Sequence, residues 1–355
     1  MPPYARALVL LLCASASGTA RAADCNGEST PGPPNLNPID TEPPMFVRAV
    51  KNGKLFTVGR GDDKKDLLHL WGTPYENGLA MGQLLGPKLP AFINQVYAYT
   101  EGQIIAKAAN NTILRDIVRM GIDVALNLSY ARTKDYIKPY VIEELQGLAD
   151  STGGRVSMVQ IRNVMWLGEI TRGSCSMYGA WGDAVAAERE GKLLQLRALD
   201  WDTDGPFKNY AAIVVYHPQA GQGHAWANLG FGGWTGSITG FSSSQLALSE
   251  IGVSYPDASF GPETYLAKGY PFSYLIRDIL QFDGTLEAAT HRIQSATRTC
   301  DLILGVGAGK ENSFSGFQYS PHVANVIKDH NLAPVNDSWH PPISEMVYWG
   351  MDWIW

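Results

Sequence analysis

The chain has 355 residues, of which 45% are hydrophobic and 17% charged. This composition supplies a large buried core and excludes an intrinsically disordered protein. The formal net charge of −6 at pH 7 argues against nucleic acid as a partner. A neutral small molecule or a lipid is easier to accommodate as a substrate.

Residues 1–22 have the pattern of a signal peptide. Arg6 supplies a short positive start, Leu8–Ala14 is apolar, and Ala20-Arg21-Ala22 fits an A-x-A cleavage site. The apolar stretch is too short to cross roughly 30 Å of hydrocarbon, so a membrane anchor is the weaker interpretation. No other stretch is a candidate transmembrane helix. We therefore expect a secreted or lysosomal protein that passes through an oxidising compartment.

Two further features accompany this expected route. Three N-glycosylation sequons place acceptor residues at Asn110, Asn127 and Asn336. Residues 23–44 include a proline-rich stretch that indicates an extended lead-in rather than a folded element.

Residues 45–174 are predicted to form a mainly helical piece. A helix should begin at Thr73, because Thr73-Pro74-Tyr75-Glu76 is a capping box with proline at the first helical position. From Pro87 to Ala149 the apolar residues recur at helical spacing. Strand character is confined to Met45–Val58 and Leu67–Leu70.

The pattern changes at Cys175, after which short strand candidates lie in a glycine-rich setting. The predicted strands are Ala211–Tyr216, His224–Leu229, Gly236–Thr239, Gln245–Glu250, Leu302–Gly305, Gly316–Tyr319 and Val323–Ile327, and the predicted helices are Pro271–Gln281 and Leu286–Thr297. These elements alone indicate a mixed α and β protein, with residues 175–355 as its second piece.

A predicted hairpin at the start of this piece carries candidate catalytic residues. Two strand-like runs, Cys175–Ala187 and Lys192–Leu199, flank the polar turn Glu188–Gly191. Such a hairpin returns Arg197 and Asp200 beside Cys175. A thiol is a strong nucleophile only as the thiolate, which requires a base and a positive field.

Cleavage of the bond between Ser174 and Cys175 would supply that base. The new α-amino group, with an ordinary pKa of roughly 8, would be attached to the nucleophile itself. Asp200 could then orient the amine, and Arg197 could stabilise the thiolate or a substrate carbonyl oxygen.

The pattern Cys-Ser, hairpin, Arg-x-x-Asp-Trp resembles the N-terminal-nucleophile (Ntn) cysteine hydrolases. These include bile-salt hydrolases, acid ceramidase, N-acylethanolamine acid amidase, penicillin-type acyltransferases and phospholipase B-like proteins. Thr73–Gly86 and Glu143–Asp150 resemble further segments of these families. The resemblance implies an α+β protein, an Ntn αββα sandwich preceded by the mainly helical piece. It also implies Cys175 as nucleophile, Arg197 and Asp200 as its partners, and Asn336 as an oxyanion donor.

Glu143 and Glu144, within the second of these segments, could be taken for a pair of catalytic carboxylates. Adjacent residues do not share a helix face, so we expect both at the surface.

The cysteines suggest how the two pieces stay together after cleavage. Loss of Cys13 with the signal peptide leaves Cys25, Cys175 and Cys300, an odd number in a secreted chain. If Cys175 is the nucleophile, a disulfide between Cys25 and Cys300 can tether the fragments. The alternative is a buried free thiol at Cys300.

Neither a metal nor a cofactor is predicted. The seven histidines show no zinc-binding spacing. Asp200-x-Asp202-x-Asp204-Gly205 begins like an EF-hand loop, but Ala211 occupies the position of its last ligand. Ser244 stands where a serine-hydrolase elbow needs glycine.

We therefore predict an autoproteolytic amidohydrolase that cleaves an N-acyl amide, ceramide-like and without cofactors. The alternatives are a penicillin-type acyltransferase, a phospholipase B-like hydrolase, and an inactive binding protein that keeps the Ntn fold. The piece from Cys175 onward is short compared with related catalytic chains, which suggests a C-terminal truncation.

Overall fold

The computed structural model describes residues 41–107, 112–170, 174–200, 205–253, 255, 258–261, 267–332 and 342–350. The predicted signal peptide and residues 23–40 of the lead-in therefore lie outside the described residues. So do Cys25, Asn110 and Asn336.

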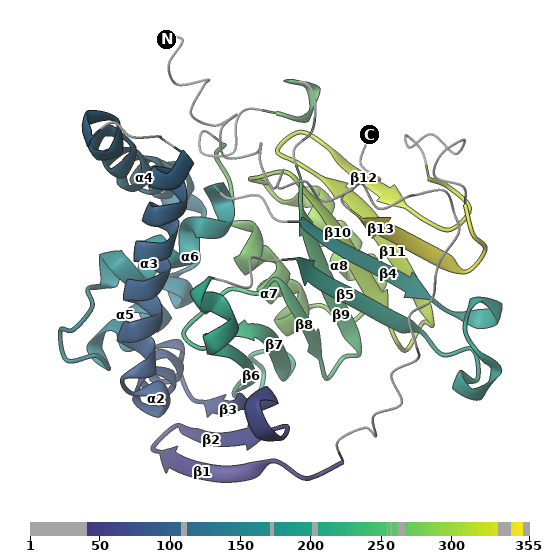
Figure 1. The fold of residues 1–355 in the computed structure, drawn as a ribbon. Helices are drawn as coiled ribbons and strands as arrows, with labels where there is room; N and C mark the ends of the chain where they lie inside the picture. The colour runs from purple at the N-terminus through teal and green to yellow at the C-terminus, as the bar shows by residue number, and fades with distance from the viewer. Residues whose placement is uncertain are drawn as a thin grey trace.

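Two β-sheets lie face to face (Figure 1). The larger has ten strands in the order β1 (Met45–Val50), β2 (Gly53–Val58), β3 (Lys65–Trp71), β6 (Ala211–His217), β7 (Trp226–Phe231), β8 (Thr239–Ser242), β9 (Leu246–Gly252), β10 (Leu302–Ala308), β11 (Ser313–Tyr319) and β12 (Ala324–Ile327). The smaller consists of β13 (Met346–Gly350), β4 (Ser174–Ala180) and β5 (Leu194–Asp200). Among the described strands of the large sheet, β3 and β6 pair in parallel and the other neighbours are antiparallel.

Seven α-helices among the described residues form two groups (Figure 1). Five precede Cys175 and gather beside the first strands of the large sheet: α2 (Pro74–Leu85), α3 (Lys88–Lys107), α4 (Thr112–Thr133), α5 (Pro139–Asp150) and α6 (Met158–Ile170). The other two, α7 (Phe272–Phe282) and α8 (Leu286–Ser295), pack on strands of the second half of that sheet. None of the helices within the described ranges has both the length and the hydropathy needed to cross a bilayer.

Local sequence explains how α2 begins and how closely it packs. The Thr73 side chain accepts from the Glu76 backbone N–H at 3.2 Å, and the Glu76 carboxylate accepts from the Thr73 N–H at 3.0 Å, which completes the predicted capping box. Helix α2 then crosses α5 at two glycines. A Cβ atom at Gly78 would overlap the backbone of Glu144, and one at Gly147 would overlap the backbone of Tyr75.

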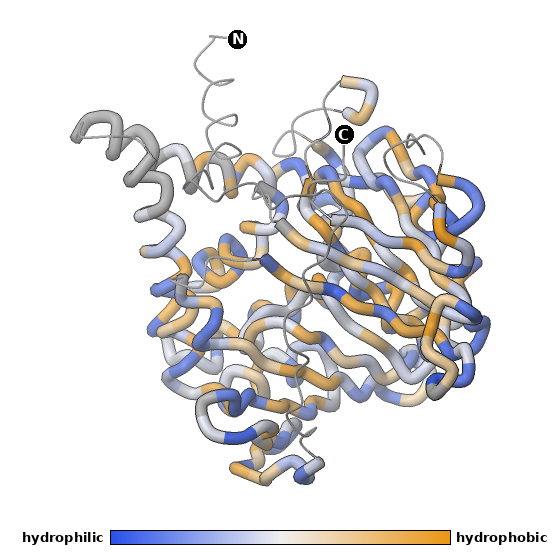
Figure 2. Tube along the Cα trace, turned by 45° about the vertical axis from the view of Figure 1, so that its right-hand side comes forward, coloured by the Kyte–Doolittle hydropathy of each residue, from blue (hydrophilic) through white to orange (hydrophobic). Residues whose placement is uncertain are grey.

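The apolar residues form two cores. One lies between the helices and the large sheet, and the other lies between the two sheets around Cys175, Met177, Phe314 and Trp349. Strand β10 contacts both α8 and β4, and every residue of Leu302–Ala308 is buried. Figure 2 shows hydrophobic residues in orange along the strands and helices, while hydrophilic residues in blue gather mainly in peripheral turns.

The predicted fold class, α+β with two stacked sheets and a mainly helical N-terminal piece, is confirmed. The first hairpin strand is shorter than expected, because the 3-10 turn Gly182–Ala184 interrupts the first predicted run and a second 3-10 turn, Ala187–Arg189, begins at its last residue. On the outer face of the small sheet, Leu194 and Leu196 are exposed.

The prediction that Glu144 lies at the surface is wrong. Glu143 is exposed, whereas Glu144 is fully buried and pairs with Arg277 Nη1 at 2.6 Å. Its other carboxylate oxygen accepts from the Tyr216 hydroxyl at 2.9 Å. The helix α5 turns this side chain toward α7 and β6, where its charge is matched.

Candidate active site

The β4–β5 hairpin fixes which residues meet at the candidate site. Its register pairs Cys175 with Leu199, Met177 with Arg197, and Ser174 with Asp200. Because side chains alternate along a strand, Cys175 and Arg197 lie on the same face, toward the large sheet. They are diagonal neighbours, a separation that a long side chain can bridge.

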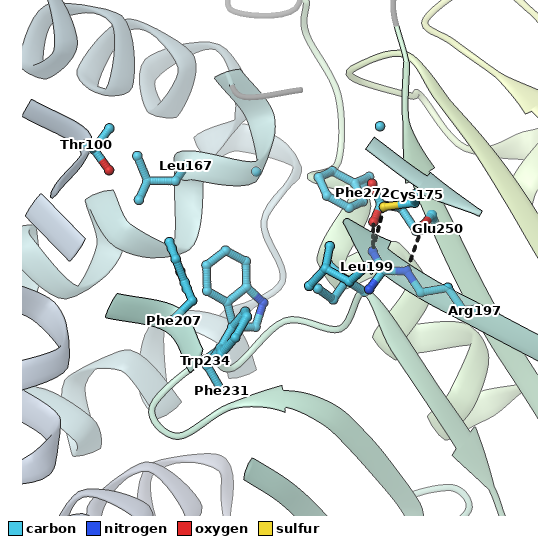
Figure 3. A pocket seen from close by; sticks show the side chains of 13 residues that line it. Thr100, Leu167, Cys175, Arg197, Leu199, Phe207, Phe231, Trp234, Glu250 and Phe272 are labelled. Atoms are coloured by element: carbon cyan, nitrogen blue, oxygen red, sulfur yellow. Dashed lines mark hydrogen bonds and ion pairs between the residues drawn. The ribbon is translucent and has the colours of Figure 1, made fainter. Parts of the chain in front are cut away.

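Arg197 contacts the candidate nucleophile directly. Its Nη2 lies 3.3 Å from Cys175 Sγ and donates to the sulfur (Figure 3). Cys175 is 1% exposed, so the pair lies at a buried end of the sheet interface. The structure therefore brings together a thiol and the positive charge that a thiolate requires.

Glu250 is a member of this cluster that the sequence analysis missed. Arg197 Nη2 lies 3.1 Å from Glu250 Oε2, and Arg197 Nε donates to the Glu250 carbonyl oxygen at 3.1 Å. Both side chains are buried. The one sequence signal is a charged residue at the end of an apolar strand, which does not by itself identify a partner. Burial raises the pKa of Glu250, while Arg197 acts in the opposite direction.

The surroundings of Cys175 favour the neutral thiol in the uncut chain. Burial raises the pKa of Cys175 to about 11. The Arg197 charge and a hydrogen bond from the Asp200 backbone act to lower this pKa, and the charges of Glu250 and Asp200 act to raise it. A further positive charge or base beside the sulfur is therefore needed for thiolate chemistry near neutral pH.

Asp200 lies beside the bond proposed to be cut. It is the strand partner of Ser174, and its side chain is exposed, on the face of β5 opposite to Arg197. The structure thus groups Cys175, Arg197 and Asp200 at one end of the hairpin. Asn336 lies outside the described residues.

An apolar pocket of about 690 Å³, including the part open to solvent, adjoins the thiol (Figure 3). Its lining comes from the N-terminal helices, from the hairpin and from the large sheet with α7: Thr100, Leu167, Gly168, Cys175, Arg197, Leu199, Phe207, Phe231, Trp234, Ile238, Glu250, Gly252 and Phe272. Cys175, Arg197 and Glu250 therefore form the polar end of an otherwise largely apolar cavity.

Two further residues named in the sequence predictions, one for a disulfide and one for glycosylation, lie within the described part of the chain. Cys300 is buried, but its proposed partner Cys25 lies outside the described residues, so the disulfide stays a prediction. Asn127 is exposed on α4, and its side-chain oxygen accepts from Arg162 Nη2 at 2.6 Å. Among the residues that the structure describes, no group of three or more His, Cys, Asp or Glu side chains is arranged to hold a metal ion.

Sequence comparison identifies relatives. Protein dcd1A of Dictyostelium discoideum is 30% identical over 348 residues, which cover 94% of this chain and 75% of dcd1A. The chain belongs to the dcd1A family. Protein dcd1B of the same organism is 31% identical over 315 residues, covering 87% of this chain and 60% of dcd1B. An uncharacterized protein of Archaeoglobus fulgidus is 21% identical over 282 residues, covering 74% of this chain and 44% of that protein.

The chain is thus shorter than its dcd1A-family relatives, of which it spans three quarters (dcd1A) and 60% (dcd1B). No family model matches its sequence.

Solved structures show a distant likeness. An N-acylethanolamine-hydrolyzing acid amidase ortholog from Caenorhabditis elegans has 19% sequence identity and a TM-score of 0.36, covering 50% of this chain and 70% of that chain. A mutant of the conjugated bile acid hydrolase from Clostridium perfringens has 13% identity and a TM-score of 0.30, covering 43% and 50%. Penicillin V acylase from Agrobacterium tumefaciens has 13% identity and a TM-score of 0.23, covering 44% and 42%.

Proposed function

We propose that this dcd1A-family chain is an Ntn cysteine hydrolase that cleaves N-acyl amides with Cys175 as its nucleophile. The observation that carries the proposal is the 3.3 Å contact between Arg197 Nη2 and Cys175 Sγ at one end of an apolar pocket. A buried thiol against a guanidinium, with open space on the substrate side, is an arrangement suited to acyl transfer to sulfur.

The first step is cleavage of the chain itself. Cys175 Sγ attacks the carbonyl carbon of Ser174, the C–N bond breaks as the nitrogen takes a proton, and a thioester links Ser174 to Cys175. Water then hydrolyses the thioester, leaving a carboxylate on Ser174 and a free α-amine on Cys175. The role assigned to Asp200 in this proposal is to orient the new ammonium group, and its position as the strand partner of Ser174 supports that assignment.

Catalysis then uses the same sulfur. The α-amine takes the thiol proton, the sulfur attacks the substrate carbonyl carbon, and the α-ammonium returns the proton to the departing amine. Arg197 favours the thiolate by its charge and is itself held by Glu250. Water hydrolyses the acyl-thioester and releases the carboxylic acid.

The pocket supports a substrate with an apolar acyl part. Phe207, Phe231, Trp234 and Phe272 line it together with aliphatic side chains, and such walls favour a hydrocarbon chain over a charged group. We therefore propose a lipid-like, ceramide-like amide as the substrate class. The proposed location, secretion or a lysosome, is supported by the signal-peptide pattern of residues 1–22.

The test begins with the mass and N-terminal sequence of the purified protein, with and without a reductant, after incubation at mildly acidic pH. A new N-terminus at Cys175, release of dodecanoic acid from N-dodecanoyl amides, and loss of both in Cys175→Ala are expected. Ser176→Ala is the matched control, because this neighbour faces away from the pocket by strand alternation, and it should be cut normally.

Fragments that separate only after reduction would support the tether between Cys25 and Cys300. A chain that stays whole and inactive under every condition would contradict the hydrolase and favour a binding protein. Transfer of the acyl group to an added amine in preference to water would indicate an acyltransferase.

A further inference from the structure

The pocket contains a buried hydrogen-bond donor without an acceptor. Trp234 is 6% exposed, and its indole Nε1 is buried with no hydrogen-bond partner among the described residues. Figure 3 shows this nitrogen on the side of the indole ring that faces Leu199. A buried N–H that has no acceptor loses its hydration without compensation, so such groups are rare and call for an explanation.

Within the described part of the chain, the pocket walls offer this donor few acceptors. Most side chains around the indole are aromatic or aliphatic, Arg197 is a donor only, and the Thr100 hydroxyl lies on the far side of the pocket from the indole nitrogen (Figure 3). The Glu250 carboxylate could accept, but it is already held by Arg197 at 3.1 Å. An oxygen carried by a ligand in the cavity would supply the acceptor that these described walls lack.

Hydrogen bonds within the protein hold the backbone on both sides of Trp234. Its loop joins β7 to β8, and backbone or side-chain hydrogen bonds hold it on each side: Gly232 N–H to the Tyr210 carbonyl at 2.9 Å, Trp234 N–H to the Phe231 carbonyl at 3.1 Å, Arg277 Nη1 to the Thr235 carbonyl at 2.9 Å, and Asn228 Nδ2 to the Gly236 carbonyl at 2.9 Å. The neighbouring Gly233 has a φ of +96°, which a side chain would strain. A donor held in this way can select a ligand at low entropic cost.

Gly168 on α6 lies where the Phe272 and Trp234 rings approach the helix. A Cβ atom there would lie 3.1 Å from the Phe272 ring and 3.9 Å from Trp234 Cζ2. The helix backbone therefore packs against the Phe272 ring and comes within ordinary contact distance of the indole.

We propose that Trp234 is a specificity-determining residue whose indole N–H binds a neutral oxygen, a ketone or hydroxyl, on the acyl part of the substrate. The proposal rests on the proposed function for the assignment of the acyl chain to this pocket. A neutral oxygen fits better than a carboxylate, because an ion would be buried among apolar walls without a counter-charge of its own. The substrate class is thus an oxygenated acyl amide rather than an amide of a plain saturated acid.

The experiment uses dodecanoyl 4-nitroanilides that carry a ketone at carbon 3, 5, 7 or 9, compared with the unsubstituted anilide. In the processed wild-type protein, one ketone position should raise kcat/KM by roughly 3- to 10-fold, the range expected for one neutral hydrogen bond. Trp234→Phe keeps an aromatic ring without the N–H and should remove this preference while still hydrolysing the plain anilide.

Trp226→Phe is the matched control. Trp226 Nε1 is likewise buried without a partner among the described residues, but its ring stacks on Tyr216 at 4.3 Å between centroids and does not line the pocket. This variant should retain the ketone preference. Equal kcat/KM for every ketone position and the plain anilide in the wild type would overturn the proposal, as would a preference that survives in Trp234→Phe.

A binding measurement separates this inference from the proposed function. Calorimetry with dodecanamide and its ketone derivatives needs no catalysis, and the same single position should bind 3- to 10-fold more tightly to the wild type than to Trp234→Phe. If no anilide is hydrolysed and the chain stays uncut but this preference appears, the hydrolase fails and the Trp234 contact stands. If anilides are hydrolysed without any ketone preference, the hydrolase stands and the contact fails.

Discussion

Glu144 and Arg277 form a buried ion pair between the two pieces of the chain. Glu144 belongs to the piece before the proposed cleavage point, and Arg277 belongs to the piece after it. The contact is 2.6 Å, and the side chains are 0% and 3% exposed. The guanidinium also lies over the rings of Tyr140, Tyr216 and Trp226. The pair therefore links helices α5 and α7 through charge, hydrogen bonds and ring contacts together.

Removing one member of this pair should be strongly destabilising. Glu144→Gln leaves the Arg277 charge buried without its partner, for which we expect a loss of about 3–5 kcal/mol in the free energy of unfolding. Urea denaturation measures it. The neighbouring Glu143→Gln, at an exposed position, should change stability by no more than about 0.5 kcal/mol, and equal losses for the two variants would contradict the assignment.

The contact between Arg197 and Cys175 predicts a defect in chemistry rather than in folding. Arg197→Lys keeps a positive charge but loses the fork that reaches both Glu250 and the sulfur. We expect the rates of self-cleavage and of amide hydrolysis to fall by about 100-fold or more, the size typical for one oriented donor in an active site. A mass-spectrometric time course measures both rates. In that measurement Arg189→Lys, at an exposed position outside the pocket, should behave like the wild type.

The raised pKa of Cys175 predicts how the uncut chain reacts with alkylating agents. With a pKa of about 11, the thiol should react slowly with iodoacetamide at pH 7–9 and faster as the pH approaches 11. The folded chain holds this proton more tightly than the unfolded chain, whose thiol has its ordinary pKa of about 9. Stability from this group is therefore present below pH 9 and is lost as the pH rises toward 11. Peptide mapping against Cys175→Ser assigns the label, and rapid labelling of the uncut chain at pH 7 would contradict the prediction.

The charge of Glu250 should also affect the pKa of Cys175. Its negative charge raises the pKa of Cys175, so Glu250→Gln should shift the alkylation profile to lower pH, whereas Glu250→Asp should shift it less. A merely structural role would lower stability without moving the profile. An unchanged midpoint in a folded Glu250→Gln variant would show that the carboxylate does not act on the thiol.

Local sequence patterns were sufficient to predict the hairpin and the helix start. The capping box at Thr73 and the strand–turn–strand pattern after Cys175 depend on residues close together in the chain, and the alternation of a strand then placed Arg197 beside the thiol. Glu250 could not be found in this way, because its partner Arg197 is 53 residues away. For the same reason the burial of Glu144 was missed, since no short-range pattern reveals which distant helix will supply a counter-charge. Trp234 could not be found from the sequence either, because the pocket that it lines is assembled from segments far apart in the chain.

The parallel pairing of β3 with β6 has a consequence for the stability of the protein if the chain is cut as proposed. These strands belong to segments on either side of the Ser174–Cys175 bond, yet they share one ladder from Asp66–Ala212 to Trp71–His217. Once that bond is broken, restoring the sheet from separated fragments is a second-order reaction that depends on concentration, unless a covalent link survives elsewhere. Without such a link, the cut protein would stay folded because its unfolding is slow, and not because its unfolded fragments can refold. Heat inactivation should therefore become irreversible once the chain is cut.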